Sequence, residues 1–272
     1  MDAIASDRSF AGSIPRIYDT YLVPLLFAPY AEDLARRLAA RPLSRVLEVA
    51  AGTGAATRAL ASALPAHVDI VATDLNQAML DQAAAAGMPR AVEWRQADAQ
   101  ELPFADAAFD TVVCQFGAMF FPDKARAFAE ARRVLRPDGL LLFNVWTAIE
   151  ENELADTVSA ALASVFPDDP PRFMARTPHG YHDERVIALD LAGGGFTAPP
   201  RFETLDARSR AATAEVAAIA YCQGTPLRNE IERRDASRLR EATTVTEAFI
   251  AKRFGPGPID AGMRATVVAV ER

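Results

Sequence analysis

Short apolar segments alternate with helical segments five times in the middle of the chain, and this alternation constrains the fold most strongly. The predicted strands are 45–50, 67–73, 91–95, 109–115 and 140–146. Helical runs separate them, and the turn at 136–139 is expected to interrupt the chain before the last strand. Such a pattern is typical of βαβ units, whose strands form a mostly parallel sheet with right-handed crossovers. The sequence therefore predicts an α/β fold that binds ligands at the carboxyl ends of its strands.

Composition excludes several classes of protein. Half of the 272 residues are hydrophobic and 24% are charged, which is typical of a globular protein with a sizeable core. The net charge of −7 and the lack of a basic tail disfavour nucleic-acid binding. Cys114 and Cys222 are too few for a disulfide framework or a four-cysteine zinc site. The first residues lack the features of a signal peptide, and no apolar run is long enough for a membrane span, so we expect a cytoplasmic protein without membrane insertion.

The regions around the alternating segments predict a cap and a lid. Residues 1–44 are expected to be a helical cap, with Tyr30, Leu34 and Leu38 on one helix face. Residues 45–147 are expected to form the core, and residues 148–272 are expected to supply the remaining strands and helical lid insertions of the same domain. The proline-rich stretch 167–178 fits either part of that lid or a surface loop.

The segment Val46–Gly54, VLEVAAGTG, is a predicted strand that ends in a turn of small residues and opens a helix. Small residues let a backbone approach a ligand closely, and the first turn of a helix offers unpaired N–H groups. The dinucleotide fingerprint would need glycine at position 57, where Thr57 stands. This departure counts against a tightly bound pyrophosphate.

Two aspartates follow the next two predicted strands. Asp74 comes 20 residues after Gly54, where a carboxylate can accept the hydroxyl protons of a ribose. Asp98 follows the third strand, where it can accept a hydrogen bond from the exocyclic amine of adenine. Each alone fits a solvated loop aspartate or a turn cap, but at successive strand ends beside the small-residue turn they predict an adenosine site.

These motifs carry a family resemblance. The stretches VLEVAAGTG, IVATDLN, WRQADAQELPF, FDTVVCQFGAMFFPD and EARRVLRPDGLLLFNVW resemble the class I S-adenosylmethionine-dependent methyltransferases over about residues 40–147. The resemblance is closest to the branch of the ubiquinone/menaquinone C-methyltransferases (methyltransferase type 11). It implies a Rossmann-like, mostly parallel seven-stranded sheet with helices on both faces, an antiparallel last strand and a helical cap or lid.

The resemblance also implies the chemistry. The cofactor would be S-adenosyl-L-methionine, released as S-adenosyl-L-homocysteine, with no metal. The acceptor would be a small, apolar or aromatic metabolite methylated on O, N or C, by a monomer or homodimer that binds no nucleic acid.

Site residues carry over by position. The implied cofactor contacts are Tyr18, Glu48, Ala50, Gly52, Gly54, Asp74, Leu75, Asp98, Ala99, Gln115 and Phe116. The residues between 48 and 54 would shape the methionine pocket, Asp74 would bind the ribose, and Leu75, Asp98 and the Ala99 N–H the adenine. Gln115 and Phe116 would lie beside the sulfonium, and Tyr18 would close over the cofactor. Glu48 stands where the family has aspartate, and Ala50 where it has its first glycine.

A general base is required only for a poorly nucleophilic acceptor. The candidates are His179, His182 and Tyr21, with Tyr181 and Cys222 behind them; solvated loop histidines and a packed cysteine are the plainer alternatives. Phe116, Met119, Phe120 and Phe121 are expected either in the core or along an apolar acceptor site.

Two other functions remain open. One is a binding module that holds S-adenosylmethionine without methylating an acceptor. The other is an NAD(P)-dependent dehydrogenase, which the spacing from Gly54 to Asp74 permits but Thr57 and the absence of a Tyr-x-x-x-Lys sequence oppose. A nucleic-acid or protein methyltransferase finds no support, because CQFG stands where an NPPY-like clamp would follow the fourth strand.

Overall fold

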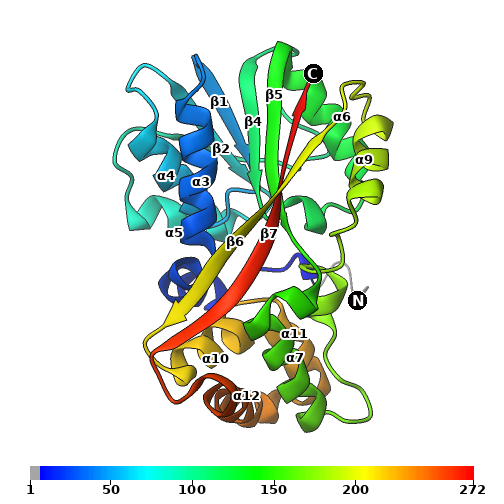
Figure 1. Cartoon of the computed structure of the whole chain (residues 1–272). Coiled ribbons are helices and arrows are strands. Elements are labelled where there is room, and N and C mark those ends of the chain that lie inside the picture. The colour runs from blue at the N-terminus through cyan, green and yellow to red at the C-terminus, as the bar shows by residue number, and fades with distance from the viewer. Residues whose placement is uncertain (1–6) are drawn as a thin grey trace. The chain divides into compact units, whose positions relative to one another are not determined.

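The computed structural model describes residues 7–272, which group into two compact units (Figure 1). Of the described residues, unit 1 comprises 7–27, Thr147–Gly180 and Asp206–Arg264, and unit 2 comprises Ala28–Trp146, Tyr181–Leu205 and Ala265–Arg272. Each unit is therefore assembled from segments that are far apart in the sequence.

A seven-stranded sheet has the order β3-β2-β1-β4-β5-β7-β6. Its strands are β1 Arg45–Val49, β2 Asp69–Asp74, β3 Glu93–Gln96, β4 Phe109–Gln115, β5 Leu135–Trp146, β6 Arg201–Ala211 and β7 Ile259–Glu271. The first five pair in parallel, and β7 runs antiparallel to β5. The predicted fold class is confirmed: the order reverses between β1 and β4, which places the ends of these two strands at a topological switch point.

Helices cover both faces of the sheet in unit 2 because successive strand residues point to opposite sides. On one face, Leu140 and Leu142 of β5 pack in a cluster with Leu34 of α3 (Ala28–Ala39) and Leu60 of α4 (Ala55–Ala63). Tyr30, Leu34 and Leu38 are fully buried, as their helical spacing predicts. On the other face, Phe143 packs against Phe128 of α6 (Lys124–Val134). Helices α5 (Gln77–Ala86) and α9 (Glu184–Gly193) complete the unit.

Strand β5 begins earlier than the sequence analysis expects. The predicted turn at 136–139 is part of the strand, which starts at Leu135 directly after α6. A register shift between Phe109 and Thr111 opposite this segment marks an irregularity of the bulge type, and Asp138 adopts a φ of +64°. The extra residues are therefore absorbed within the strand and not in a separate loop.

Unit 1 is mainly helical. It contains α2 (Ile14–Ile17), a π-helix η1 (Tyr18–Phe27), α7 (Glu153–Val165), α8 (Phe173–Arg176), α10 (Ala214–Gln223), α11 (Leu227–Asp235) and α12 (Leu239–Phe254). Proline at position 24 lies inside η1 and has no N–H to give to a helical hydrogen bond. A buried ion-pair network joins Asp7 and Glu230 through Arg176, at 2.7 and 2.5 Å. Within 7–272, no helix has both the length and the apolar character needed to cross a membrane.

Candidate functional site

The loop after β1 turns sharply through left-handed backbone conformations. Ala50, Gly52 and Gly54 have φ of +56°, +57° and +81°. Glycine adopts such conformations at no steric cost, whereas Ala50 is strained there. The Gly52 N–H donates to a carboxylate oxygen of Asp74, and the Gly54 N–H closes the turn on the Ala51 carbonyl at 2.9 Å. The loop therefore has one defined shape before α4 begins at Ala55.

Asp74 lies at the end of β2, beside this loop. Its Oδ2 accepts the Gly52 N–H and its Oδ1 accepts the Asn76 N–H, each at 2.8 Å, while the Asn76 side-chain amide lies 3.4 Å from Oδ1. The side chain is 8% exposed, and burial raises its pKa against the opposing effect of these N–H bonds. A carboxylate has about four acceptor positions, so the two short bonds leave capacity on its oxygens for further donors.

Two neighbours of Asp74 provide an apolar surface and a second carboxylate. They are Leu75, the next residue in the chain, and Asp98, in the segment that follows β3. Leu75 is 42% exposed, unusual for so large an apolar side chain in this protein. The Ala97 N–H donates to the Asp74 carbonyl at 3.0 Å, which joins the segment after β3 to the end of β2. The next residue is Asp98, whose Oδ1 accepts the Gln100 N–H at 2.9 Å. The structure thus brings Gly52, Asp74 and the Asp98 segment together.

Glu48 is buried beneath the loop. Its carboxylate accepts the Thr57 hydroxyl at 2.6 Å, and burial raises its pKa to about 8, because a charged carboxylate loses its hydration there. Glu48 therefore keeps its proton at neutral pH.

The end of β4 forms a second wall of unit 2. Gln115 is half-buried, and the following Phe116 has a φ of +49°. The Phe116 ring stacks on Trp146 with centroids 3.9 Å apart, and Tyr30 contacts both rings edge to face. The aromatic cluster fixes the direction of Phe116.

Gly117 couples this wall to the loop after β1. A Cβ at position 117 would lie 2.5 Å from the Ala50 Cβ and 2.7 Å from the Cys114 Sγ, closer than packed atoms approach. Only glycine fits between the two segments, so the position of Ala50 depends on that of the turn after β4.

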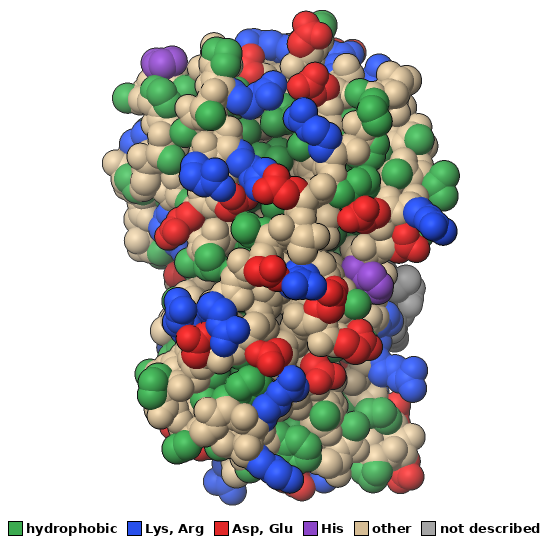
Figure 2. All heavy atoms as spheres, in the orientation of Figure 1, with side chains coloured by type: hydrophobic (Ala, Val, Ile, Leu, Met, Phe, Trp, Pro, Cys, Tyr) green, Lys and Arg blue, Asp and Glu red, His purple; other side chains and the backbone are tan. Residues whose placement is uncertain are grey.

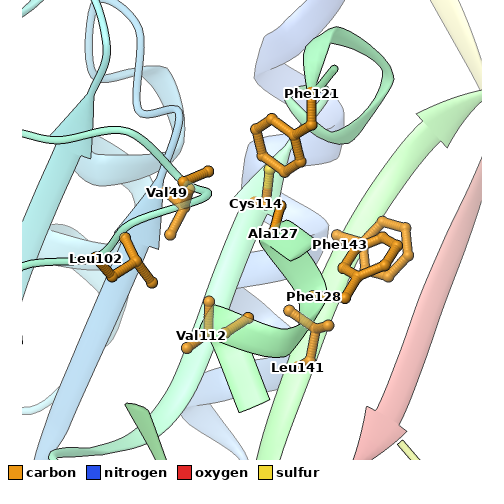
Figure 3. A pocket seen from close by; sticks show the side chains of 11 residues that line it. Val49, Leu102, Val112, Cys114, Phe121, Ala127, Phe128, Leu141 and Phe143 are labelled. Carbon is orange, nitrogen blue, oxygen red and sulfur yellow. The ribbon is translucent and has the colours of Figure 1, made fainter. Parts of the chain in front are cut away.

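A small apolar cavity lies farther inside unit 2 (Figure 3). Its lining includes Val49, Cys114, Phe121, Phe128 and Phe143, and its volume is about 10 Å³. Ala99 lines it too. Cys114 is packed there, and burial raises the pKa of its thiol to about 12. Phe121 is half-buried where it lines this cavity, and Met119 is buried.

The candidate bases are distributed over both units. His179 in unit 1 is buried, with Nδ1 2.9 Å from the Thr147 carbonyl. His182 in unit 2 is exposed, as is His67. In unit 1, Tyr21 and Tyr18 are half-buried on η1, and Tyr18 stacks on Phe27 at 5.2 Å.

Tyr181 and Cys222 are engaged in packing. The Tyr181 hydroxyl donates to Asp190 at 2.8 Å, and Cys222 is buried beside Thr246. No group of three or more potential metal ligands occurs in the described part of the chain.

Sequence reasoning missed three residues of this region. Thr53 has a buried hydroxyl without a hydrogen-bond partner among residues 7–272, and the same holds for Nδ2 of Asn144. The third residue is Trp146, whose ring stacks on Phe116 and contacts Tyr30 edge to face. Thr53 stands between Gly52 and Gly54, so the small-residue turn indicates its position. The sequence does not distinguish Asn144 and Trp146 from other strand residues.

Fold and site together define an α/β protein with a tight loop of small residues at its switch point. A family model described as a methyltransferase domain matches residues 47–143. The ubiquinone/menaquinone biosynthesis C-methyltransferase UbiE of Teredinibacter turnerae is 31% identical over 169 residues, which cover 57% of this chain and 68% of that protein. An uncharacterized protein of Mycobacterium tuberculosis is 36% identical over 177 residues, which cover 63% of this chain and 60% of that protein.

Solved structures show the same fold. A SAM-dependent methyltransferase from Aquifex aeolicus has a TM-score of 0.51 at 19% identity, over 70% of this chain and 89% of that one. The chain belongs to the S-adenosylmethionine-dependent methyltransferase family.

Proposed function

We propose that this protein transfers a methyl group from S-adenosylmethionine to an O, N or C atom of a small, apolar or aromatic metabolite. The observation that carries the proposal is the Asp74 carboxylate, bonded to the Gly52 and Asn76 N–H groups with acceptor capacity remaining, next to the exposed Leu75. A carboxylate beside an apolar side chain matches a ribose beside an adenine.

The residues of the site fit this cofactor. Asp74 would accept the two ribose hydroxyls, Leu75 would contact the adenine face, and Asp98 would accept the adenine amine. The fit is supported by the buried Thr53 hydroxyl, a polar group without a partner in the described residues of the loop. The loop from Ala50 to Gly54 would hold the methionine part, and Gln115, Phe116 and Ala99 would complete the pocket.

When bound, S-adenosylmethionine supplies a methyl group that its positive sulfur has already activated. The chain then has to align the acceptor for in-line displacement and exclude water. The stacked Phe116 and Trp146 rings support this role, because they form a rigid apolar wall at the end of β4 and β5. Tyr18 is proposed to close over the cofactor.

If the acceptor requires a base, we propose His179, His182 and Tyr21 as the candidates. A carbonyl only accepts, so the His179 Nδ1 donates to Thr147 at 2.9 Å. His182 is exposed, and Tyr21 is half-buried on η1.

The net charge of −7 disfavours a nucleic-acid partner. On the face drawn in Figure 2, acidic and basic side chains are interspersed, whereas a nucleic-acid partner would require a basic patch. We propose that the enzyme acts in the cytoplasm, as a monomer or homodimer.

Titration calorimetry with S-adenosylmethionine and S-adenosylhomocysteine tests the proposal. We expect the wild type to bind both and Asp74→Asn to bind at least about tenfold more weakly, since a charged hydrogen-bond acceptor is lost. Asp69→Asn is the matched control, because Asp69 is exposed at the opposite end of the same strand. Absence of wild-type binding, or equal binding by Asp74→Asn, would contradict the proposal.

Methyl transfer from isotope-labelled cofactor to a panel of phenols, amines and quinols then separates the functions. Tight cofactor binding without transfer to any of them would favour a non-catalytic binding module. An NAD(P)H-dependent absorbance change would instead favour the dehydrogenase.

A further inference from the structure

Asn144 lies at the end of β5, directly beside Gln115 of β4 in the sheet register. Its side chain is fully buried, at 0% exposure. The Asn144 Oδ1 accepts the Phe116 N–H at 3.0 Å, and the Asn144 main-chain carbonyl accepts the same N–H at 3.2 Å. Two oxygens of one residue therefore hold a single amide of the turn after β4.

The nitrogen end of the Asn144 side-chain amide lowers the stability of the protein. Nδ2 of Asn144 is buried without a hydrogen-bond partner in the described range 7–272, and a buried donor in that state lowers stability. Leucine has a similar size and would avoid the cost. Since the main-chain carbonyl already accepts the Phe116 N–H, the side chain is not needed to satisfy that group. The asparagine side chain adds a second hydrogen bond that restrains the conformation of Phe116.

That conformation is strained. Phe116 has a φ of +49°, which non-glycine residues adopt at an energetic cost. In this conformation its ring stacks on Trp146, and the next residue, Gly117, fits against Ala50 with no room for a side chain. A relaxed Phe116 would shift Gly117, and with it the floor of the loop that begins at Ala50.

We propose that Asn144 is a positioning residue of the cofactor site: its Oδ1 holds Phe116 in the left-handed conformation that lets Gly117 support the loop after β1. This role rests on the proposed function, and it requires no contact between Asn144 and cofactor or acceptor. The Nδ2 without a partner in the described residues then lowers the stability of the protein, and this loss accompanies the correct shape of the loop.

The variant Asn144→Leu tests the role, with S-adenosylhomocysteine as the probe in calorimetry and melting temperature as the measure of stability. We expect binding about tenfold weaker, the factor that matches the usual cost of a left-handed non-glycine residue once its support is lost. The melting temperature should stay the same or rise, because the orphaned donor is removed. A residue that only stabilises the fold would instead lower affinity and melting temperature together, and that result would overturn the proposal.

A double-mutant cycle with Phe116→Gly locates the effect. Glycine adopts positive φ freely, so Asn144→Leu should weaken binding less than twofold in that background. An undiminished tenfold loss there would show that Asn144 acts by another route and would also overturn the proposal. Equal binding by Asn144→Leu and wild type would overturn the role of Asn144 alone, whereas a wild type that binds no cofactor would overturn the proposed function with it.

Discussion

Replacing Glu48 by glutamine should stabilise the protein increasingly as pH rises. Burial raises the pKa of Glu48 from 4.5 to about 8, so the folded protein keeps this proton up to about pH 8. The unfolded chain, with the ordinary value, loses it near pH 4.5. Between these values the unfolded state binds fewer protons than the folded state, so wild-type stability falls as pH rises.

The expected size follows from the proton linkage. One proton contributes about 1.4 kcal/mol per pH unit, so the free energy of unfolding of Glu48→Gln relative to wild type should increase by about 3 kcal/mol from about pH 5.5 to 7.5. Glutamine has the same size and retains an oxygen for the Thr57 hydroxyl, which Glu48 binds at 2.6 Å. Little else should change.

Urea unfolding of both proteins at several pH values in this range measures the difference. Glu101→Gln is a control, because that side chain is 85% exposed and water solvates it in both states. A difference between Glu48→Gln and wild type that stays constant with pH would refute the reasoning, since it would mean that Glu48 ionises alike in the folded and unfolded chain.

Three further predictions follow from the geometry. Gly117→Ala should lower the free energy of unfolding by about 1–3 kcal/mol, because the new methyl would lie 2.5 Å from Ala50; an unchanged melting temperature would contradict the packing described. Binding of S-adenosylhomocysteine should weaken as pH falls and Asp74 becomes protonated, because the ribose donors favour the ionised carboxylate whose pKa burial raises; calorimetry at several pH values should find this slope in the wild type and lose it in Asp74→Asn. Asp7→Ala should destabilise the protein by about 1–3 kcal/mol in chemical denaturation, since the buried Asp7 makes charged bonds to Arg176; equal stability would argue against that network.

Much of the fold is encoded locally, which is why the sequence predicts it. The spacing of Tyr30, Leu34 and Leu38 marks the buried face of α3, and Asp123 caps α6 by accepting the Arg126 N–H at 2.9 Å. The pairing of Asp74 with the Gly52 loop spans 22 residues, yet topology alone brings the ends of adjacent parallel strands together. Local pattern and strand order therefore suffice for this part of the site.

Other features depend on contacts that no local pattern records. The hold of Asn144 on Phe116 joins positions 28 residues apart, and its value lies in a backbone conformation that sequence periodicity does not report. The early start of β5 has the same origin, because the predicted turn residues are accommodated by a register shift against β4. Asn76 occupies the N-cap position of α5, but its side-chain amide lies toward Asp74 instead of capping the helix.

The central claim is that Asp74 binds the ribose of the cofactor, and a ligand-by-protein cycle tests it most directly. Calorimetry would compare S-adenosylhomocysteine with its 2′,3′-dideoxy analogue on wild type and on Asp74→Ala. We predict that removing the hydroxyls weakens binding to the wild type by at least about tenfold and changes binding to Asp74→Ala by less than about twofold. Equal losses on both proteins would contradict the account, because the hydroxyls would then be recognised elsewhere.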